Sequence, residues 1–183
     1  MILPIYTYGN AVLRKKSKPI DSNFPNIKEL VDNMFETMHN ACGVGLAAPQ
    51  IGRDIRVLVI DFAQIEDEKD PELSKFRISM INPEMLEMSE ETSTEEEGCL
   101  SIPGISENVT RSKYIKIKYS DTDFVEHTEE FADYRARAIQ HEYDHLEGTM
   151  FTDKVSPLRR QLIASKLNKI IKGKTNCKYR TIK

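Results

Sequence analysis

The segment Gln140-His-Glu-Tyr-Asp-His145 combines residues that can do chemistry with the spacing that the chemistry requires. His141 and His145 are four residues apart, so on an α-helix both imidazoles face one side and can bind a single metal ion. Glu142 projects about 100° away from His141, near enough to reach a water molecule on that metal. The motif is short, and 30% of the chain is charged, so a solvated polar helix face is the alternative interpretation.

A third ligand would distinguish a catalytic metal site from a polar helix face. One class of zinc protease has a further histidine six residues after the second, but Phe151 stands there in this chain. Another class uses a downstream glutamate, yet no Asp or Glu follows Asp153. The best upstream candidate is Cys99, a soft ligand flanked by small residues, although it could also be an inert thiol or a nucleophile. A Cys-His-His set would leave a fourth position open for water.

The glycine-rich segment Gly43–Gly52 leaves its backbone unusually bare. Such a segment can approach a ligand closely and offer main-chain N–H groups to it. It lacks the Gly-Lys-Ser/Thr ending of a phosphate-binding loop. Within it, Gln50 has a donor and an acceptor and can stabilise a developing oxyanion if it faces the site. A tight helix-to-strand turn is the alternative.

Hydrophobic periodicity places these segments on secondary structure. Apolar residues at three- and four-residue spacing predict an N-terminal helix that begins near residues 23–26 and ends before Gly43. A second helix is expected over residues 133–146, ended by Gly148, and a third from Pro157 onward. Predicted strands cover residues 56–61, 76–82, 114–119 and 125–131, and residues 64–75 form an exposed acidic loop.

Composition sets further limits. A chain of 183 residues is expected to form one domain, residues 1–183, and no run of apolar residues is long enough to span a bilayer. The start of the chain has no secretory signal, and three widely spaced cysteines are not a disulfide framework, so a cytoplasmic protein is expected.

The net charge of −3 is unevenly distributed. From Lys154 to Lys183 there are ten Lys or Arg residues and no Asp or Glu, so an acidic body carries a basic C-terminal segment with a tail at about residues 173–183. Such a segment can contact a polyanion such as the ribosome; a solvated helix face with a frayed end is the alternative.

Three segments together resemble bacterial-type peptide deformylases: Gly43–Gln50, Glu97–Ser101 and Gln140–His145. The resemblance implies an α+β fold with mixed or antiparallel strands around a central metal-binding H-E-x-x-H helix, plus an N-terminal and a C-terminal helix. It also implies removal of the formyl group from the N-terminal formylmethionine of newly synthesised polypeptides, with release of formate.

The resemblance also assigns roles to residues. Those implied are Cys99, His141 and His145 as metal ligands, Glu142 as general acid/base, Gln50 and the Leu100 N–H as oxyanion donors, and Val44, Gly45 and Leu100 as the methionine pocket. Hydroxide on the metal would attack the formyl carbon. Fe²⁺ is the implied metal in cells, and the same ligands accommodate Zn²⁺, Ni²⁺ or Co²⁺.

One departure from the family concerns the peptide beyond methionine. Bacterial relatives often have an arginine shortly after the Cys-Leu-Ser segment, where this chain has Ser106, and Arg111 is further along. The expected partners are N-formylmethionyl peptides and the ribosome, with no membrane and no sequence-specific nucleic acid. A zinc endopeptidase lacks its third ligand here. A metal-stabilised binding module would need a fourth, which neither Cys42 nor Cys177 supplies in a C-x-x-C pair.

Overall fold

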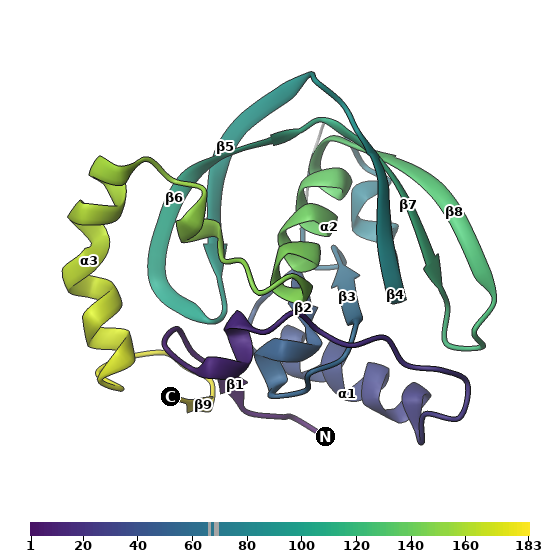
Figure 1. Cartoon of the computed structure of the whole chain (residues 1–183), viewed down its shortest axis with the longest axis horizontal. Helices are drawn as coiled ribbons and strands as arrows, with labels where there is room; N and C mark the ends of the chain where they lie inside the picture. The colour runs from purple at the N-terminus through teal and green to yellow at the C-terminus, as the bar shows by residue number, and fades with distance from the viewer. Residues whose placement is uncertain (66, 68–69) are drawn as a thin grey trace.

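The helix α2 (Asp133–Leu146) lies between a five-stranded sheet and a two-stranded hairpin (Figure 1). The computed structural model describes residues 1–65, 67 and 70–183. Within that part of the chain there are three α-helices, and the larger sheet and the hairpin are antiparallel, as expected for an α+β fold.

The larger sheet has the strand order β2-β3-β4-β7-β8. Its strands are β2 (Gly45–Ala47), β3 (Val57–Asp61), β4 (Arg77–Met88), β7 (Tyr114–Ser120) and β8 (Glu126–Ala132). The hairpin consists of β5 (Thr92–Cys99) and β6 (Ile102–Ser112). The two ends of the chain meet in a parallel pair, β1 (Ile5–Tyr6) and β9 (Thr181–Ile182) (Figure 1).

The predicted helices are confirmed. The helix α1 (Ile27–Asn40) buries apolar residues at three- and four-residue spacing against β2 and β3. The helix α3 (Pro157–Ile171) begins after Ser156, whose hydroxyl accepts a hydrogen bond from the Arg159 N–H, and Pro157 has the φ that a first helical turn requires. Gly148 follows α2 in the left-handed region at φ +73°, where a side chain would collide with the Arg14 carbonyl.

The predicted strand at residues 76–82 does not stop at Pro83, so that boundary was wrong. The strand β4 continues to Met88, with a shift of its register against β7 between Ile81 and Glu84. Asn82 adopts a positive φ of 50° at this irregularity. Because the irregularity removes Pro83 from regular pairing, its missing N–H does not interrupt the ladder.

The expectation of an exposed loop over residues 64–75 is only partly met. Residues 66, 68 and 69 of that loop lie outside the described residues. In the described part, Leu73 is buried in the core and Asp70 forms an ion pair with Arg135. The loop is therefore held to the body by an apolar and an ionic contact.

Three groups of buried side chains surround α2 and hold its neighbours in place. One lies between the large sheet and α2, the second between α1 and strands β2 and β3, and the third joins β6 and α3 to the N-terminal arm. Among the described residues, no helix is long and apolar enough to cross a membrane.

Candidate metal centre

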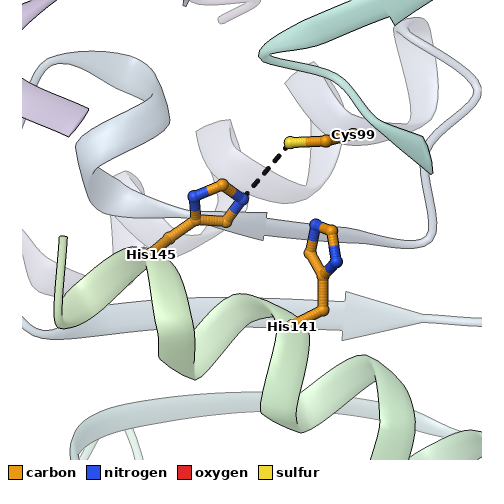
Figure 2. A group of neighbouring side chains, drawn as sticks. All are labelled: Cys99, His141 and His145. Carbon is orange, nitrogen blue, oxygen red and sulfur yellow. Dashed lines mark hydrogen bonds between the residues drawn. The ribbon is translucent and has the colours of Figure 1, made fainter. Parts of the chain in front are cut away.

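Two elements bring the three predicted ligands together. His141 and His145 project from one face of α2, and Cys99 comes from the end of β5 (Figure 2). One ligand atom from each residue lies within 4.8 Å of the other two, and Cys99 Sγ is 3.3 Å from His145 Nε2. Ligands of a tetrahedral metal with bonds of about 2.0 to 2.3 Å lie roughly 3.5 Å apart, so the set fits one ion.

Cys99 reaches α2 because β5 and β6 form a tight hairpin. Cys99 pairs with Ile102, which leaves Leu100 and Ser101 as a two-residue turn, and the register shifts between Gly98 and Cys99. Such irregularities re-aim side chains next to functional sites. The turn therefore presents Cys99 and the Leu100 N–H to the same space.

Glu97 connects the hairpin to α2 and is the main residue that the sequence reasoning missed. Its buried carboxylate accepts hydrogen bonds from Arg111 Nε at 2.6 Å and Nη2 at 2.9 Å, and from Arg137 Nη1 at 2.6 Å. His141 Nδ1 lies 2.9 Å from its other oxygen. A carboxylate on Nδ1 fixes the imidazole and leaves Nε2 for a metal. A carboxylate two residues before a ligand cysteine was the available signal in the sequence.

The pKa values of this cluster follow from burial and pairing. Burial alone would raise the pKa of Glu97, but hydrogen bonds from His141 and Arg111 hold it well below its usual range. Burial likewise opposes the charged form of His141, yet contacts with Cys99 and Glu97 raise its pKa to about 10. Burial and the neighbouring His141 lower the pKa of His145 well below the usual value, so His145 is a neutral imidazole suited to binding a metal.

Glu142 lies deep in the site with one carboxylate oxygen unpartnered. Burial raises its pKa to about 7, against the lowering effect of His141 and Arg111. Its Oε2 and the Nδ1 of His145 are buried polar atoms without a hydrogen-bond partner among the described residues. Such atoms are costly unless a ligand, ion or water completes them. A pKa near neutrality is also what proton transfer in either direction requires.

The bare segment after α1 is needed because β2 runs directly against Glu142. A Cβ on Gly45 would lie 2.3 Å from Glu142 Oε1, and one on Gly43 would lie 2.7 Å from the Leu100 side chain. The predicted helix-to-strand turn is here a short strand, β2, followed by a 3-10 helix at Ala48–Ile51. The glycines allow backbone and carboxylate to share this space.

Gln50 is buried and its amide orientation is set by three contacts. Its Oε1 accepts a hydrogen bond from the Ala47 N–H at 2.8 Å. Its Nε2 donates to Ser101 Oγ at 3.2 Å and points at Cys99 Sγ, 3.5 Å away. The amide N–H groups therefore face the metal ligands, which is the direction an oxyanion donor needs.

A cavity of about 870 Å³ opens onto these groups. Its lining includes most of the predicted site residues: Val44, Gly45, Gln50, Cys99, Leu100, His141 and Glu142. His145 is buried and is not in that lining. Ser106 lines the cavity and donates to Glu96 Oε1 at 2.9 Å. Arg111 is committed to Glu97 and to Asp144, at 2.8 Å, so it does not replace the missing arginine.

The comparison with known families decides the identity. A family model described as polypeptide deformylase matches residues 2–161. The chain belongs to the peptide deformylase family. It is therefore a hydrolase of the class that acts on N-formylmethionyl peptides, and its Cys-His-His cluster fits the metal dependence of the family.

Relatives extend the likeness of this deformylase over nearly the whole chain. The peptide deformylases of Christiangramia forsetii and Flavobacterium johnsoniae are 47% and 48% identical to it, with 98% of this chain and 95% of each relative covered. The crystal structure of the Thermotoga maritima deformylase is 41% identical, with a TM-score of 0.77, and covers 86% of this chain and 99% of its own. An Acinetobacter baumannii deformylase structure with Met-Ala-Ser bound is 33% identical, with a TM-score of 0.78, and covers 85% and 99%.

The close approach of Gly45 to Glu142 predicts a large effect of one methyl group. Gly45→Ala should lower the deformylation rate about 100-fold, because the new Cβ displaces a carboxylate whose position matters on the scale of an ångström. Gly98→Ala is the matched control, since its Cβ would meet only the Ile105 carbonyl at 3.8 Å. Formate release by the two metal-loaded variants measures the difference, and equal rates would contradict the assigned contact.

The Glu97 contacts predict a loss of metal affinity. Glu97→Gln should weaken binding of Zn²⁺ or Co²⁺ about 10- to 100-fold, because His141 loses the carboxylate that orients it. Glu107→Gln is the control, since Glu107 is also buried and paired with an arginine, Arg159, but the described contacts of its carboxylate do not include the histidines. Titration of folded protein against a competing chelator measures both variants. Unchanged affinity in Glu97→Gln would show that this carboxylate does not support the ligand.

Proposed function

We propose that the chain is a metal-dependent deformylase that removes the N-formyl group from the terminal formylmethionine of newly synthesised polypeptides and releases formate. The convergence of Cys99, His141 and His145 with the unpartnered carboxylate of Glu142 in one cavity carries this proposal. The binding of Met-Ala-Ser by a deformylase 33% identical to this chain supports a peptide with an N-terminal methionine as the ligand.

Cys99, His141 and His145 would hold one divalent metal and leave a position open. Such a metal, when bound, acidifies a water molecule and makes a nucleophile available near neutral pH. We propose Fe²⁺ in cells, on the family resemblance, with Zn²⁺, Ni²⁺ or Co²⁺ as alternatives, because one thiolate and two imidazoles accommodate all four.

Glu142 is the proposed general acid/base. Its carboxylate is buried beside the ligands, and a pKa raised to about 7 lets it accept the proton from water. It then transfers this proton to the amine nitrogen as the bond to the formyl carbon breaks. Burial excludes bulk water from the transfer.

Gln50 and the Leu100 N–H are the proposed oxyanion donors. The side-chain amide is fixed by Ala47 and Ser101, so it needs no reorganisation when negative charge develops on the formyl oxygen. Val44, Gly45 and Leu100 line the cavity and are the proposed contacts of the methionine side chain.

Deformylation of formyl-Met-Ala-Ser without oxygen tests this mechanism. Glu142→Gln should lower kcat about 100- to 10,000-fold with unchanged metal content, because it removes the proton acceptor and keeps the shape. Glu96→Gln, on the lining of the same cavity, is the matched control. No formate from the wild type would refute the function, and equal rates in the wild type and Glu142→Gln would refute the mechanism.

We also propose that residues 1–183 form one catalytic domain that works in the cytoplasm, where formylated chains are made. The pairing of β9 with β1 supports inclusion of the tail in this domain. Nascent peptides are the proposed partners, together with ribosomal phosphates contacted by the basic C-terminal segment. Exposed lysines on and just after α3, Lys166, Lys169 and Lys172, support that contact.

Charge reversal tests the ribosome contact. Replacement of Lys166, Lys169 and Lys172 by Glu should weaken ribosome binding and reduce its salt dependence by about 0.7 to 0.9 in slope per lost phosphate contact. A triple reversal of exposed lysines elsewhere, Lys15, Lys28 and Lys75, is the control. Cosedimentation at several salt concentrations measures both, and identical slopes would exclude this surface.

A further inference from the structure

The last residues of the chain fold back onto the body. Gly173, at φ +69°, ends α3, and its N–H donates to the Ile170 carbonyl at 2.8 Å. Further on, β9 is fixed to β1: the Ile5 N–H donates to the Arg180 carbonyl at 2.9 Å and the Thr7 N–H to the Ile182 carbonyl at 2.8 Å. The residues between, Asn176–Tyr179, are here called the C-terminal strap, and both of its ends are anchored.

The C-terminal strap forms part of the wall of the cavity that contains the candidate metal centre. Each of its four residues lines that cavity, together with Cys99, Leu100 and Glu142. The volume of about 870 Å³ lies in the upper part of the range of roughly 300 to 1,000 Å³ that drug-sized ligands occupy, so there is room for residues beyond a formylmethionine.

Tyr179 joins the C-terminal strap to the turn that follows Cys99. Its hydroxyl donates to the Leu100 carbonyl at 2.8 Å, across 79 positions of sequence. Burial raises the pKa of Tyr179 above its usual value, which keeps the hydroxyl protonated as a donor. The other residue of the turn, Ser101, is held by the Tyr8 N–H at 2.8 Å and by Gln50. The turn is therefore fixed from several sides.

Lys178 gives the C-terminal strap a charge at this cavity. The other basic residue on the described lining is Arg137, which is buried and bonded to Glu97, whereas Lys178 is exposed. An exposed ammonium group can contact the carbonyl groups or the carboxylate of a bound peptide.

The position of the strap relative to the family is also informative. The family model ends at residue 161, before the C-terminal strap. Alignments with the Christiangramia and Flavobacterium relatives cover 98% of this chain and so leave only a few residues unmatched. The strap therefore lies outside the matched family region but within the length shared with these relatives.

We propose that the C-terminal strap is part of the substrate site, in which Tyr179 is a positioning residue that holds the Leu100 turn and Lys178 contacts the peptide beyond methionine. The inference rests on the proposed function, because Leu100 matters as an oxyanion donor only in that reaction. Loss of the Tyr179 hydroxyl loosens the turn and affects every substrate. Loss of the Lys178 charge affects only substrates that extend past the first residue.

Two substitutions with matched controls separate these effects. Tyr179→Phe should lower kcat about two- to tenfold on both formyl-Met-Ala-Ser and formylmethionine amide. Tyr114→Phe, on an exposed tyrosine of β7, should leave kcat unchanged. Lys178→Ala should raise KM about two- to fivefold for formyl-Met-Ala-Ser and leave formylmethionine amide unaffected. Lys174→Ala, outside the lining, is its control.

Metal content, the unfolding midpoint and calorimetric binding of Met-Ala-Ser complete the test. The proposal expects unchanged metal content and midpoints, with weaker Met-Ala-Ser binding in Lys178→Ala. It is overturned if both strap variants match their controls, or if the activity lost in Tyr179→Phe follows a loss of metal. Absence of formate from the wild type would instead refute the proposed function, and Met-Ala-Ser binding would still report on Lys178.

Discussion

The buried carboxylate of Glu97 is the interaction on which the geometry of the site depends. It receives hydrogen bonds from Arg111 on β6 and from Arg137 on α2, and it pairs with His141. A buried charge is costly unless it is paired, so the hairpin and the helix are stable only when docked in this register. Because Cys99 ends the strand that carries Glu97, the same docking brings its thiol to the two histidines.

A second constraint is the close approach of three backbones around Glu142. The carboxylate occupies the space where a side chain at residue 45 would be, and the Leu100 side chain does the same at residue 43. Only glycine permits this approach, so the bare segment reflects packing as well as ligand access. The resulting space is dry enough to raise the pKa of Glu142 to about 7.

The basic C-terminal segment has more than one structural role. Arg159 on α3 pairs with the buried Glu107 at 2.7 Å, which fastens the helix to the hairpin. The residues after α3 return to β1, and Tyr179 bonds the turn beside Cys99. A segment that composition alone presents as a polyanion-binding tail is thus also built into the walls of the cavity, and the two roles use different residues.

The sequence alone determined what depends on local spacing. The periodicity of residues 27–38 located α1, and four-residue spacing placed His141 and His145 on one helix face, because helix geometry repeats every 3.6 residues. Exclusion of Phe151 and of downstream carboxylates pointed back to Cys99. What lay beyond reach was long-range: the carboxylate of Glu97 on His141, the register shift that carries β4 through Pro83, and the Tyr179 bond to Leu100. Only the tertiary structure decided these contacts, because they join residues far apart in the chain that meet when packed elements share one buried space.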